Sequence, residues 1–372
     1  MFATRGTLSS MRHPICAWYN NSGSGYEEPE DPPKEEPKKP AEPPKPKEEK
    51  PDASQPKAGH ALVIGRFMPP HAGHQYLFDV AGEIAQVTTV LARITPNDRI
   101  PGDLRLAWLN EMVRDRVGQL TGDVDLHVNS PAFWQTWSDV VSRALVALPD
   151  APRVDLLVSS DREAWRLAEL LGARHVCVDP ERDAVSISAT DIRRDPLRHW
   201  SFLPPPVRAH YAKRIVLIGP ESSGKSTFAR ELAAALDTVH VPEQARLFAQ
   251  RTGGMLRERD LTAIAVLQRA TESAAARRAN RFVICDTDAL SLKLWGERLF
   301  GRTPEFDIHV PDLYLVTDTS IPFMGTANRD APAARSTFAA RCLAEANASG
   351  APVVRLPSDP ATRLKIALAS LR

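Results

Sequence analysis

Residues Gly219-Pro-Glu-Ser-Ser-Gly-Lys-Ser-Thr227 have the spacing G-x-x-x-x-G-K-[ST], which is typical of a phosphate-binding loop (P-loop). An apolar run over residues 214–218 precedes the stretch, and a run with helical periodicity over residues 228–236 follows it. A strand, a glycine loop and a helix are the context that such a loop needs, because its backbone amides then face an anion at the positive end of the helix. We therefore predict a nucleotide-phosphate site here.

Several residues of this loop have roles that follow from their chemistry. The glycines permit backbone angles that side chains disfavour. Lys225 would neutralise charge on the outer phosphates, and the Ser226 hydroxyl would hold Mg²⁺. The loop residues expected to contact ATP are Gly219, Ser222, Ser223, Gly224, Lys225, Ser226 and Thr227.

The composition is that of a globular protein. A length of 372 residues suggests about two domains. A formal net charge of +1 gives no electrostatic reason to expect nucleic-acid or membrane binding, and no apolar run approaches the roughly 18 residues of a membrane helix. The cysteines, at 16, 177, 285 and 342, show no metal-ligand pairing, and we interpret Cys177 and Cys285 as buried strand residues. A reducing, cytoplasmic location fits this usage.

The first 58 residues differ from the rest. Ten of the 32 prolines lie between Pro29 and Pro56, among Glu and Lys, so we expect a disordered, extended tail. Residues 1–26 carry Arg5 and Arg12 and no acid, which resembles a targeting peptide, but an unstructured leader is the favoured interpretation. The tail has no helix-turn-helix pattern, so we expect no DNA binding.

Apolar runs and helical periodicity alternate over residues 59–205. This order predicts an α/β domain with a parallel, doubly wound sheet. The expected strands are residues 61–67, 87–91, 124–128, 154–158 and 175–178. The expected helices are residues 75–85, 104–117, 134–148 and 162–171.

Two histidines flank a glycine directly after the first expected strand, in Met68-Pro-Pro-His-Ala-Gly-His74. A triphosphate would rest there on a helix N-terminus. His71 and His74 could then donate hydrogen bonds to phosphate oxygens whose charge grows during transfer. A metal site is the competing interpretation, but no third ligand stands at a suitable spacing.

A second signal is Ile187-Ser-Ala-Thr-Asp-Ile-Arg193. Ser188 and Asp191 form an S-x-x-D capping pattern, so a short helix should begin here. Its free amides and the Arg193 guanidinium would supply a second anion-binding corner. Taken alone, the pattern is also that of an ordinary helix start.

Residues 206–372 predict a second doubly wound parallel-sheet domain, a P-loop kinase. A strand over residues 281–286 ends in Asp286, where a carboxylate would lie near Mg²⁺ together with Ser226. Arg329 and Arg335 fall where a mobile lid would bring cations to ATP. The residues expected to hold the hydroxyls of a kinase substrate are Glu243, Arg246 and Asp288.

The two signals of the first domain resemble motifs of the nucleotidyltransferase superfamily. Residues 65–74 resemble G-x-F-x-P-x-H-x-G-H, and residues 187–193 resemble I-S-x-T-x-I-R. The resemblance implies attack of an acceptor on the α-phosphate of ATP, with release of pyrophosphate. The ATP-contacting residues that it implies are Gly65, Arg66, Phe67, His71, His74, Ser188, Thr190 and Arg193, of which His71, His74 and Arg193 would be catalytic, as Lys225 and Asp286 would be in the kinase.

The order of the two domains resembles the bifunctional NadR-type family, from about residue 60 to the C-terminus. That family joins nicotinamide-mononucleotide adenylyltransferase to ribosylnicotinamide kinase. The resemblance implies NAD salvage from nicotinamide riboside, with ATP and Mg²⁺ at both sites. The sequence does not give the oligomeric state, and we also consider a homo-oligomer. Its lid pattern W-x-x-D-G-x-R appears as Phe323-Met-Gly-Thr-Ala-Asn-Arg329, without the Asp and the Gly.

Two other functions stay open at this point. Motifs that hold ATP say little about the acceptor, so another nucleotide or a phosphopantetheine-like group could be the substrate. A nucleotide-sensing protein with a weakened kinase half is the non-enzymatic alternative.

Overall fold

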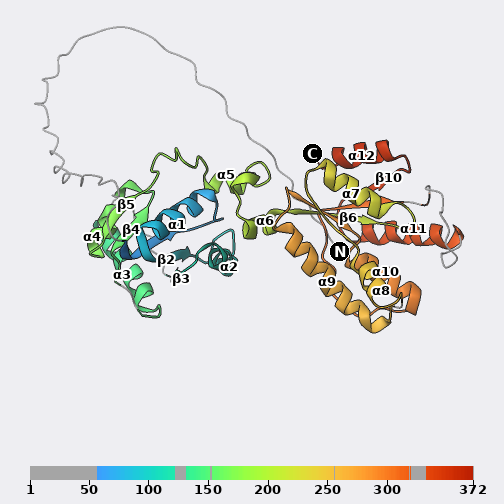
Figure 1. The fold of residues 1–372 in the computed structure, drawn as a ribbon, viewed down its shortest axis with the longest axis horizontal. Coiled ribbons are helices and arrows are strands. Elements are labelled where there is room, and N and C mark those ends of the chain that lie inside the picture. Colours follow the sequence, from blue (N-terminus) through green and yellow to red (C-terminus); the bar gives the residue numbers. More distant parts are fainter. Residues whose placement is uncertain are drawn as a thin grey trace, which may run out of the picture. The chain divides into compact units, whose positions relative to one another are not determined.

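The computed structural model describes residues 57–121, 131–150, 153–254, 256–317, 319 and 332–371. These residues form two five-stranded sheets with flanking helices (Figure 1). Every strand pair in both sheets is parallel. The prediction of an α/β protein with two parallel, doubly wound sheets is therefore confirmed.

The first sheet has the order β3-β2-β1-β4-β5. Its strands are β1 (Ala58–Gly65), β2 (Ala85–Ile94), β3 (Arg116–Thr121), β4 (Leu156–Ser159) and β5 (Arg174–Cys177). Its helices are α1 (Ala72–Ile84), α2 (Gly102–Met112), α3 (Pro131–Val146), α4 (Trp165–Leu170) and α5 (Ala189–Arg194). Because β1 is central and pairs with β2 on one side and β4 on the other, the loop that follows it lies where the strand order reverses, the usual ligand position in such sheets.

Alternation along β1 explains how helices come to cover both faces of this sheet. Leu62 packs in one apolar cluster with residues of α3 and α4. Its neighbours Ala61 and Val63 pack in another cluster with residues of α1 and α2. Successive side chains of a strand point to opposite faces, so both faces of β1 are buried and the strand reads as a continuous apolar run.

The second sheet has the order β10-β9-β6-β8-β7. Its strands are β6 (Lys213–Ile218), β7 (Val239–Val241), β8 (Phe282–Asp286), β9 (Leu313–Thr317) and β10 (Val353–Leu356). The helices that accompany it are α6 (Pro205–Tyr211), α7 (Lys225–Ala235), α8 (Gln244–Arg251), α9 (Leu261–Ala276), α10 (Ala289–Phe300), α11 (Pro332–Ala348) and α12 (Pro360–Ala369). The P-loop follows β6, again the central strand.

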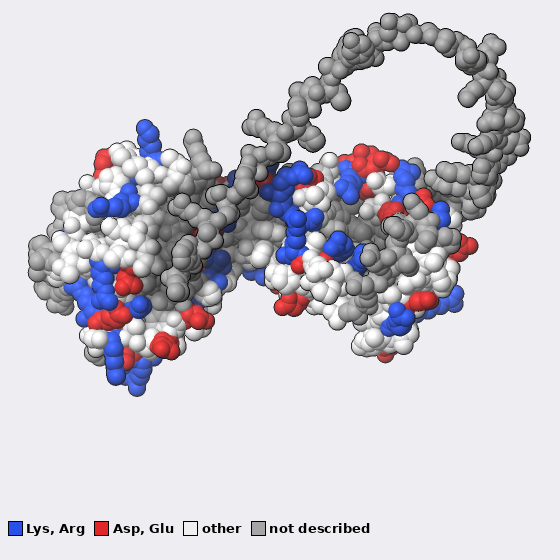
Figure 2. Space-filling model, turned by 180° about the vertical axis from the view of Figure 1, so that it is seen from behind, with Lys and Arg blue, Asp and Glu red and all other residues white. Residues whose placement is uncertain are grey.

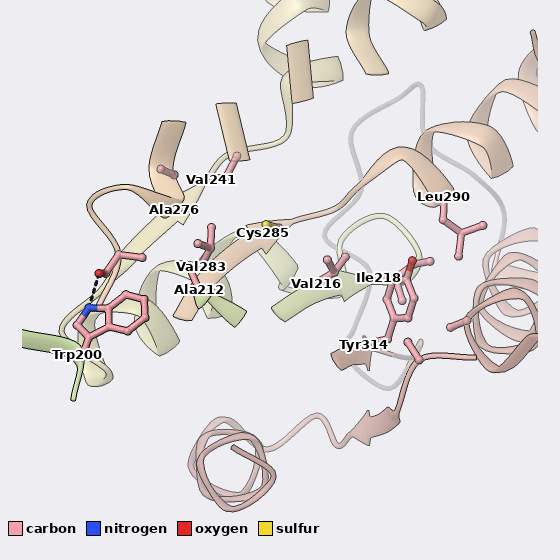
Figure 3. Close-up of a cluster of buried hydrophobic side chains, with 14 of the residues drawn as sticks. Trp200, Ala212, Val216, Ile218, Val241, Ala276, Val283, Cys285, Leu290 and Tyr314 are labelled. Atoms are coloured by element: carbon pink, nitrogen blue, oxygen red, sulfur yellow. Dashed lines mark hydrogen bonds between the residues drawn. The ribbon is translucent and has the colours of Figure 1, made fainter. Parts of the chain in front are cut away.

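The two faces of the second sheet are also buried under helices. Residues of α7 and α12 pack on one face, against Ile215 and Leu217 of β6. The other face of β6 presents Val216 and Ile218 to a cluster that includes residues of α9, α10 and α11. Figure 3 shows this second cluster, in which the Trp200 indole donates a hydrogen bond to the Ala279 carbonyl.

One part of the predicted element order is wrong. Residues 104–117 were expected to form one helix, but α2 ends at Met112 and residues 116–121 form β3. The expected strand over residues 124–128 lies outside the described residues, as do Cys16 and residues 1–56 of the predicted tail. The last residue of that tail, Ala58, begins β1. Cys285 is buried as expected, whereas Cys177 is only partly buried.

The surface agrees with the neutral composition. Among the described residues, no helix is both long enough and apolar enough to cross a membrane. Figure 2 shows basic and acidic side chains interspersed on the face drawn, in keeping with a formal net charge of +1.

A first prediction concerns the hydrogen bond of Trp200. Its Nε1 donates to the Ala279 carbonyl at 2.9 Å, and its side chain is buried. Trp200→Phe keeps an aromatic ring but leaves this carbonyl without its donor, which should lower the free energy of unfolding by about 1–3 kcal/mol. Urea denaturation measures the change, with Trp165→Phe, at a half-buried tryptophan, as the control. If both variants lost the same free energy of unfolding, the hydrogen bond of Trp200 would not explain the loss.

Candidate functional site

The first candidate site is the loop between β1 and α1. Phe67 adopts a left-handed backbone conformation, with φ 46°, and its ring is buried beneath the loop. A Cβ on Gly65 would lie 2.8 Å from this ring, so a side chain at Gly65 would collide with it. The ring also meets Phe78 and His74, with centroids 5.5 and 4.9 Å away. The Phe67 side chain, predicted to contact ATP, therefore supports the loop from the core.

His71 has a defined tautomer. It is the N-cap of α1, and its Nδ1 accepts a hydrogen bond from the Gly73 amide at 3.1 Å. In a neutral imidazole the proton must then be on Nε2, which becomes a donor. Burial and the nearby positive charge of Arg182 lower the pKa of His71 to about 4. At neutral pH, His71 is thus an uncharged Nε2–H donor.

His74 lies against His71, with ring centroids 3.8 Å apart. Burial first, and then the charges of His71 and Arg182, lower the pKa of His74 well below its usual value. Its Nδ1 is buried and has no hydrogen-bond partner among the described residues. Two neutral imidazoles in contact can each offer one N–H, which is the chemistry expected of this pair.

The second motif meets the first through Arg193. Ser188 caps α5 as predicted, since its Oγ accepts from the Asp191 amide at 3.1 Å. Arg193 donates from Nη1 to the Met68 carbonyl and from Nη2 to Thr190 Oγ1, at 3.0 Å. Two motifs separated by more than a hundred residues are thus joined at one loop.

A buried arginine that was not predicted from the sequence contacts the same loop. Arg105, in α2, has no exposed side-chain surface. It donates to the carbonyls of Ile100 at 3.1 Å and Arg93 at 3.0 Å, to the carbonyl of Arg66, and to the Asp98 carboxylate. Arg66 pairs with the same carboxylate. The Arg66 side chain, predicted to contact ATP, is therefore held by Asp98, in the loop between β2 and α2.

The second candidate site is the P-loop. Three of its residues have positive φ, Gly219 at 150°, Ser222 at 56° and Gly224 at 80°. A Cβ on Gly219 would lie 2.5 Å from the carbonyl oxygen of Thr317, at the end of β9. The backbone there leaves no room for a side chain, which explains the first glycine of the motif.

Lys225 is buried and donates to two carbonyls of its own loop. Its Nζ lies 2.9 Å from the Gly219 oxygen and 2.7 Å from the Pro220 oxygen. Burial lowers the pKa of Lys225, and the carboxylates of Glu243 and Asp286 oppose this effect. The ammonium is thus placed at the loop, with acids nearby.

A cluster of polar groups from three elements surrounds the start of α7. Arg246 bonds the Glu243 carboxylate at 2.7 Å and the Ser226 Oγ at 3.2 Å. Burial raises the pKa of Glu243. Asp286 ends β8, is 3% exposed, and its Oδ1 has no hydrogen-bond partner among the described residues.

The partnerless Asp286 oxygen fits the predicted Mg²⁺. Among the described residues there is no group of three or more His, Cys, Asp or Glu side chains that could hold a metal. Mg²⁺ at nucleotide sites does not need such a group, because waters and substrate phosphates supply most of its ligands beside one or two protein oxygens. The donor set of Asp286 and Ser226 is therefore suitable, although the assignment stays a prediction.

Asp288 occupies a different setting from that expected of a substrate ligand. It is the N-cap of α10, where Oδ1 accepts from the Ser291 amide at 2.9 Å. Its Oδ2 accepts from the Tyr314 hydroxyl. Burial raises the pKa of Asp288 and of Tyr314. Both carboxylate oxygens of Asp288 therefore accept hydrogen bonds from within the protein. Substrate binding by Asp288 stays a prediction.

Of the remaining predicted residues, Arg329 lies outside the described residues. Arg335, expected in a lid, lies in α11, where it is 4% exposed and donates to the Glu221 carbonyl at 3.1 Å. The Ser223 hydroxyl bonds Thr317 Oγ1 at 2.7 Å, so it anchors the loop to β9. A further buried arginine, Arg363, which the sequence analysis did not single out, donates to the Ser223 carbonyl.

The chain is similar to known proteins over most of its length. Residues 214–363 match a family described as "AAA domain". Two proteins named "Trifunctional NAD biosynthesis/regulator protein NadR", from Escherichia coli (strain K12) and Salmonella typhimurium (strain LT2), are each 26% identical to it. These alignments span 292 and 291 residues, 72% of this chain and 71% of each relative.

Two solved structures share the fold. One is titled "Crystal structure of NadR protein in complex with NR", with a TM-score of 0.65 and 20% identity over 85% of this chain and 96% of that chain. The other is titled "Crystal structure of NadR protein in complex with NAD and AMP-PNP", with a TM-score of 0.66 and 21% identity over 84% and 95%.

A second prediction follows from the lowered pKa of His71. Because this pKa is about 4 in the folded state and about 6.5 in an unfolded chain, the unfolded state binds more protons between these values. Acidification from pH 6.5 to 4 should thus reduce the free energy of unfolding, by roughly 3 kcal/mol from this group. His71→Asn keeps a favoured N-cap residue without a titrating ring, so its stability should fall less over this range. Urea denaturation measures the free energy of unfolding of the wild type and of His71→Asn at each pH. An equal decrease in both proteins between pH 6.5 and 4 would contradict the prediction.

Proposed function

We propose that the chain, as a member of the NadR-type family, makes NAD from nicotinamide riboside in two ATP-dependent steps. The observation that carries the proposal is the presence of two separate loops with the sequence motifs of phosphate-binding loops, each after the central strand of its own sheet. The related structures are described as complexes with NR, and with NAD and AMP-PNP. Ligands of the same classes suit the two loops of this chain.

The P-loop would carry the first step. The 5′-hydroxyl oxygen of the riboside attacks the γ-phosphorus of ATP, and the hydroxyl proton passes to water. The bond from the γ-phosphorus to the β–γ bridging oxygen breaks, and ADP leaves with its electrons. The inward-facing amides and Lys225 would stabilise the negative charge on the phosphates. Glu243 and Arg246 lie beside Ser226 at the start of α7, where they could orient the riboside.

The loop after β1 would carry the second step. A phosphate oxygen of the mononucleotide attacks the α-phosphorus of ATP. The bond from the α-phosphorus to the α–β bridging oxygen breaks, and pyrophosphate leaves with that oxygen and the bonding electrons. His71 would donate from Nε2 as charge builds on the phosphate oxygens, with His74 beside it. Arg193, which already bonds the loop at Met68, would hold the phosphates before and during transfer.

Mg²⁺ would be held in the kinase half by Asp286 and the Ser226 hydroxyl. When bound, such an ion neutralises charge on the β- and γ-phosphates. In this proposal the residues of the chain supply only two of its ligands, so ATP and Mg²⁺ should bind together.

Product analysis tests the proposal directly. Purified protein with ATP, Mg²⁺ and nicotinamide riboside should yield the mononucleotide, NAD, ADP and pyrophosphate, as read by mass spectrometry. Supplying the mononucleotide in place of the riboside should give NAD and pyrophosphate without ADP. Turnover of a different acceptor, or nucleotide binding without any product, would overturn the proposal.

A third prediction separates the two activities. Lys225→Ala removes the ammonium from the P-loop, so ADP formation from ATP and the riboside should fall at least about a hundredfold. Pyrophosphate formation from the mononucleotide should be unchanged, because that reaction uses the other sheet. The control is Lys365→Ala, at an exposed lysine of α12. Loss of both reactions in a folded Lys225→Ala protein would show that the sites are not independent.

A fourth prediction concerns Asp286. Asp286→Asn keeps the shape of the side chain and removes the charge that would hold Mg²⁺, so the Mg²⁺ concentration for half-maximal ADP formation should rise about tenfold or more. Asp237→Asn is the matched control, since that aspartate is exposed and its φ of 48° suits asparagine. If Asp286→Asn left the Mg²⁺ requirement unchanged, Asp286 would not be a Mg²⁺ ligand.

A further inference from the structure

Arg363 is a buried arginine near the C-terminus, on the second turn of α12, and only 3% of its surface is exposed. Burying a guanidinium costs free energy unless its N–H groups find acceptors. The backbone carbonyls that accept from Arg363 therefore offset part of the cost of burying its charge.

The guanidinium joins three segments of the second sheet. Its Nε donates to the Pro357 carbonyl at 2.8 Å, between β10 and α12. Its Nη1 donates to the Ser223 carbonyl in the P-loop at 3.2 Å. The guanidinium carbon lies 5.5 Å from the ring centroid of Phe228, which belongs to the helix that the P-loop opens. Two of the three contacts lie in the P-loop or in the helix that it opens.

The Ser223 contact matters because of the geometry of a phosphate-binding loop. When successive amides turn inward to an anion, the carbonyls of the same peptide units turn away from it and need donors of their own. Lys225 donates hydrogen bonds to the carbonyls of Gly219 and Pro220, and Arg335 donates to that of Glu221. Arg363 serves the carbonyl of Ser223, the residue before the second glycine of the motif.

We propose that Arg363 is a positioning residue of the P-loop, which fixes the peptide plane of Ser223 by bridging it to the carbonyl of Pro357. Through this bridge, the connection between β10 and α12 sets the direction of the P-loop amide that follows Ser223. The guanidinium itself faces the carbonyl side of the loop and makes no contact with ATP in this assignment. The kinase kinetics that test this rest on the proposed function, whereas ATP binding at the loop does not.

Variants of two basic residues on α12 give a matched test. Arg363→Met keeps an unbranched buried side chain but removes both donors, and Lys365→Met removes an exposed charge from the same helix. Arg363→Met should raise the KM for ATP in the ADP-forming reaction about tenfold. Arg363→Lys, which cannot span both carbonyls, should raise it several-fold. The KM for ATP in the pyrophosphate-forming reaction should not change, and Lys365→Met should match the wild type.

Hydrogen exchange of the peptide over residues 219–227 reports ATP binding at the P-loop without any acceptor. Mg-ATP should protect these amides in the wild type, and protection should need about tenfold more ATP in Arg363→Met. The inference would be overturned if folded Arg363→Met had the same KM for ATP and the same ATP-dependent protection as the wild type. If Arg363→Met does not fold, the same result in Arg363→Lys would overturn it. Wild-type protein that protects the peptide but forms no ADP from the riboside would instead overturn the proposed function.

Discussion

A loop that points its amides at a phosphate must also satisfy the carbonyls that face the other way, and this constraint shapes both candidate sites. In the first loop, Arg105 and Arg193 donate to backbone carbonyls. In the second, Lys225, Arg335 and Arg363 do the same. Buried carbonyls left without donors would cost free energy, and the loops could then relax toward conformations that no longer present their amides. These cations thus help to fix the backbone of each loop through its carbonyls.

This arrangement links each loop to distant parts of the chain. The first motif is tied to the second by a guanidinium from α5, and the P-loop is tied to α11 and α12. An arginine suits this task because its planar fork of N–H groups can join two acceptors, which a lysine ammonium does less specifically. The conformations of both loops therefore depend on helices that follow them by a hundred residues or more. Under the proposed function, a substitution in such a helix would change ATP binding without touching the ligand.

The sequence predicted most of the fold because the buried strands are apolar on both faces. The alternation of strand and helix, and the two motif loops that each follow a strand, were predicted from patterns of neighbouring residues. The central positions of β1 and β6 were not predicted, because strand order depends on pairing between distant segments. The strand β3 escaped prediction because Arg116-Val-Gly-Gln-Leu-Thr121 contains a glycine and polar residues, and tertiary pairing with β2 overrides its weak local preference. The partners of Arg105 and Arg363 could not be predicted, since an arginine on an amphipathic helix resembles a solvated one until the fold places carbonyls beside it.

The central claim is that one chain holds two independent phosphate-binding loops. Counting the bound molecules of a non-hydrolysable ATP analogue per chain, by native mass spectrometry in the presence of Mg²⁺ and without acceptor, tests it most directly. We predict two molecules per wild-type chain and one per chain of the Lys225→Ala variant. A wild-type chain that saturates with a single molecule would contradict the account.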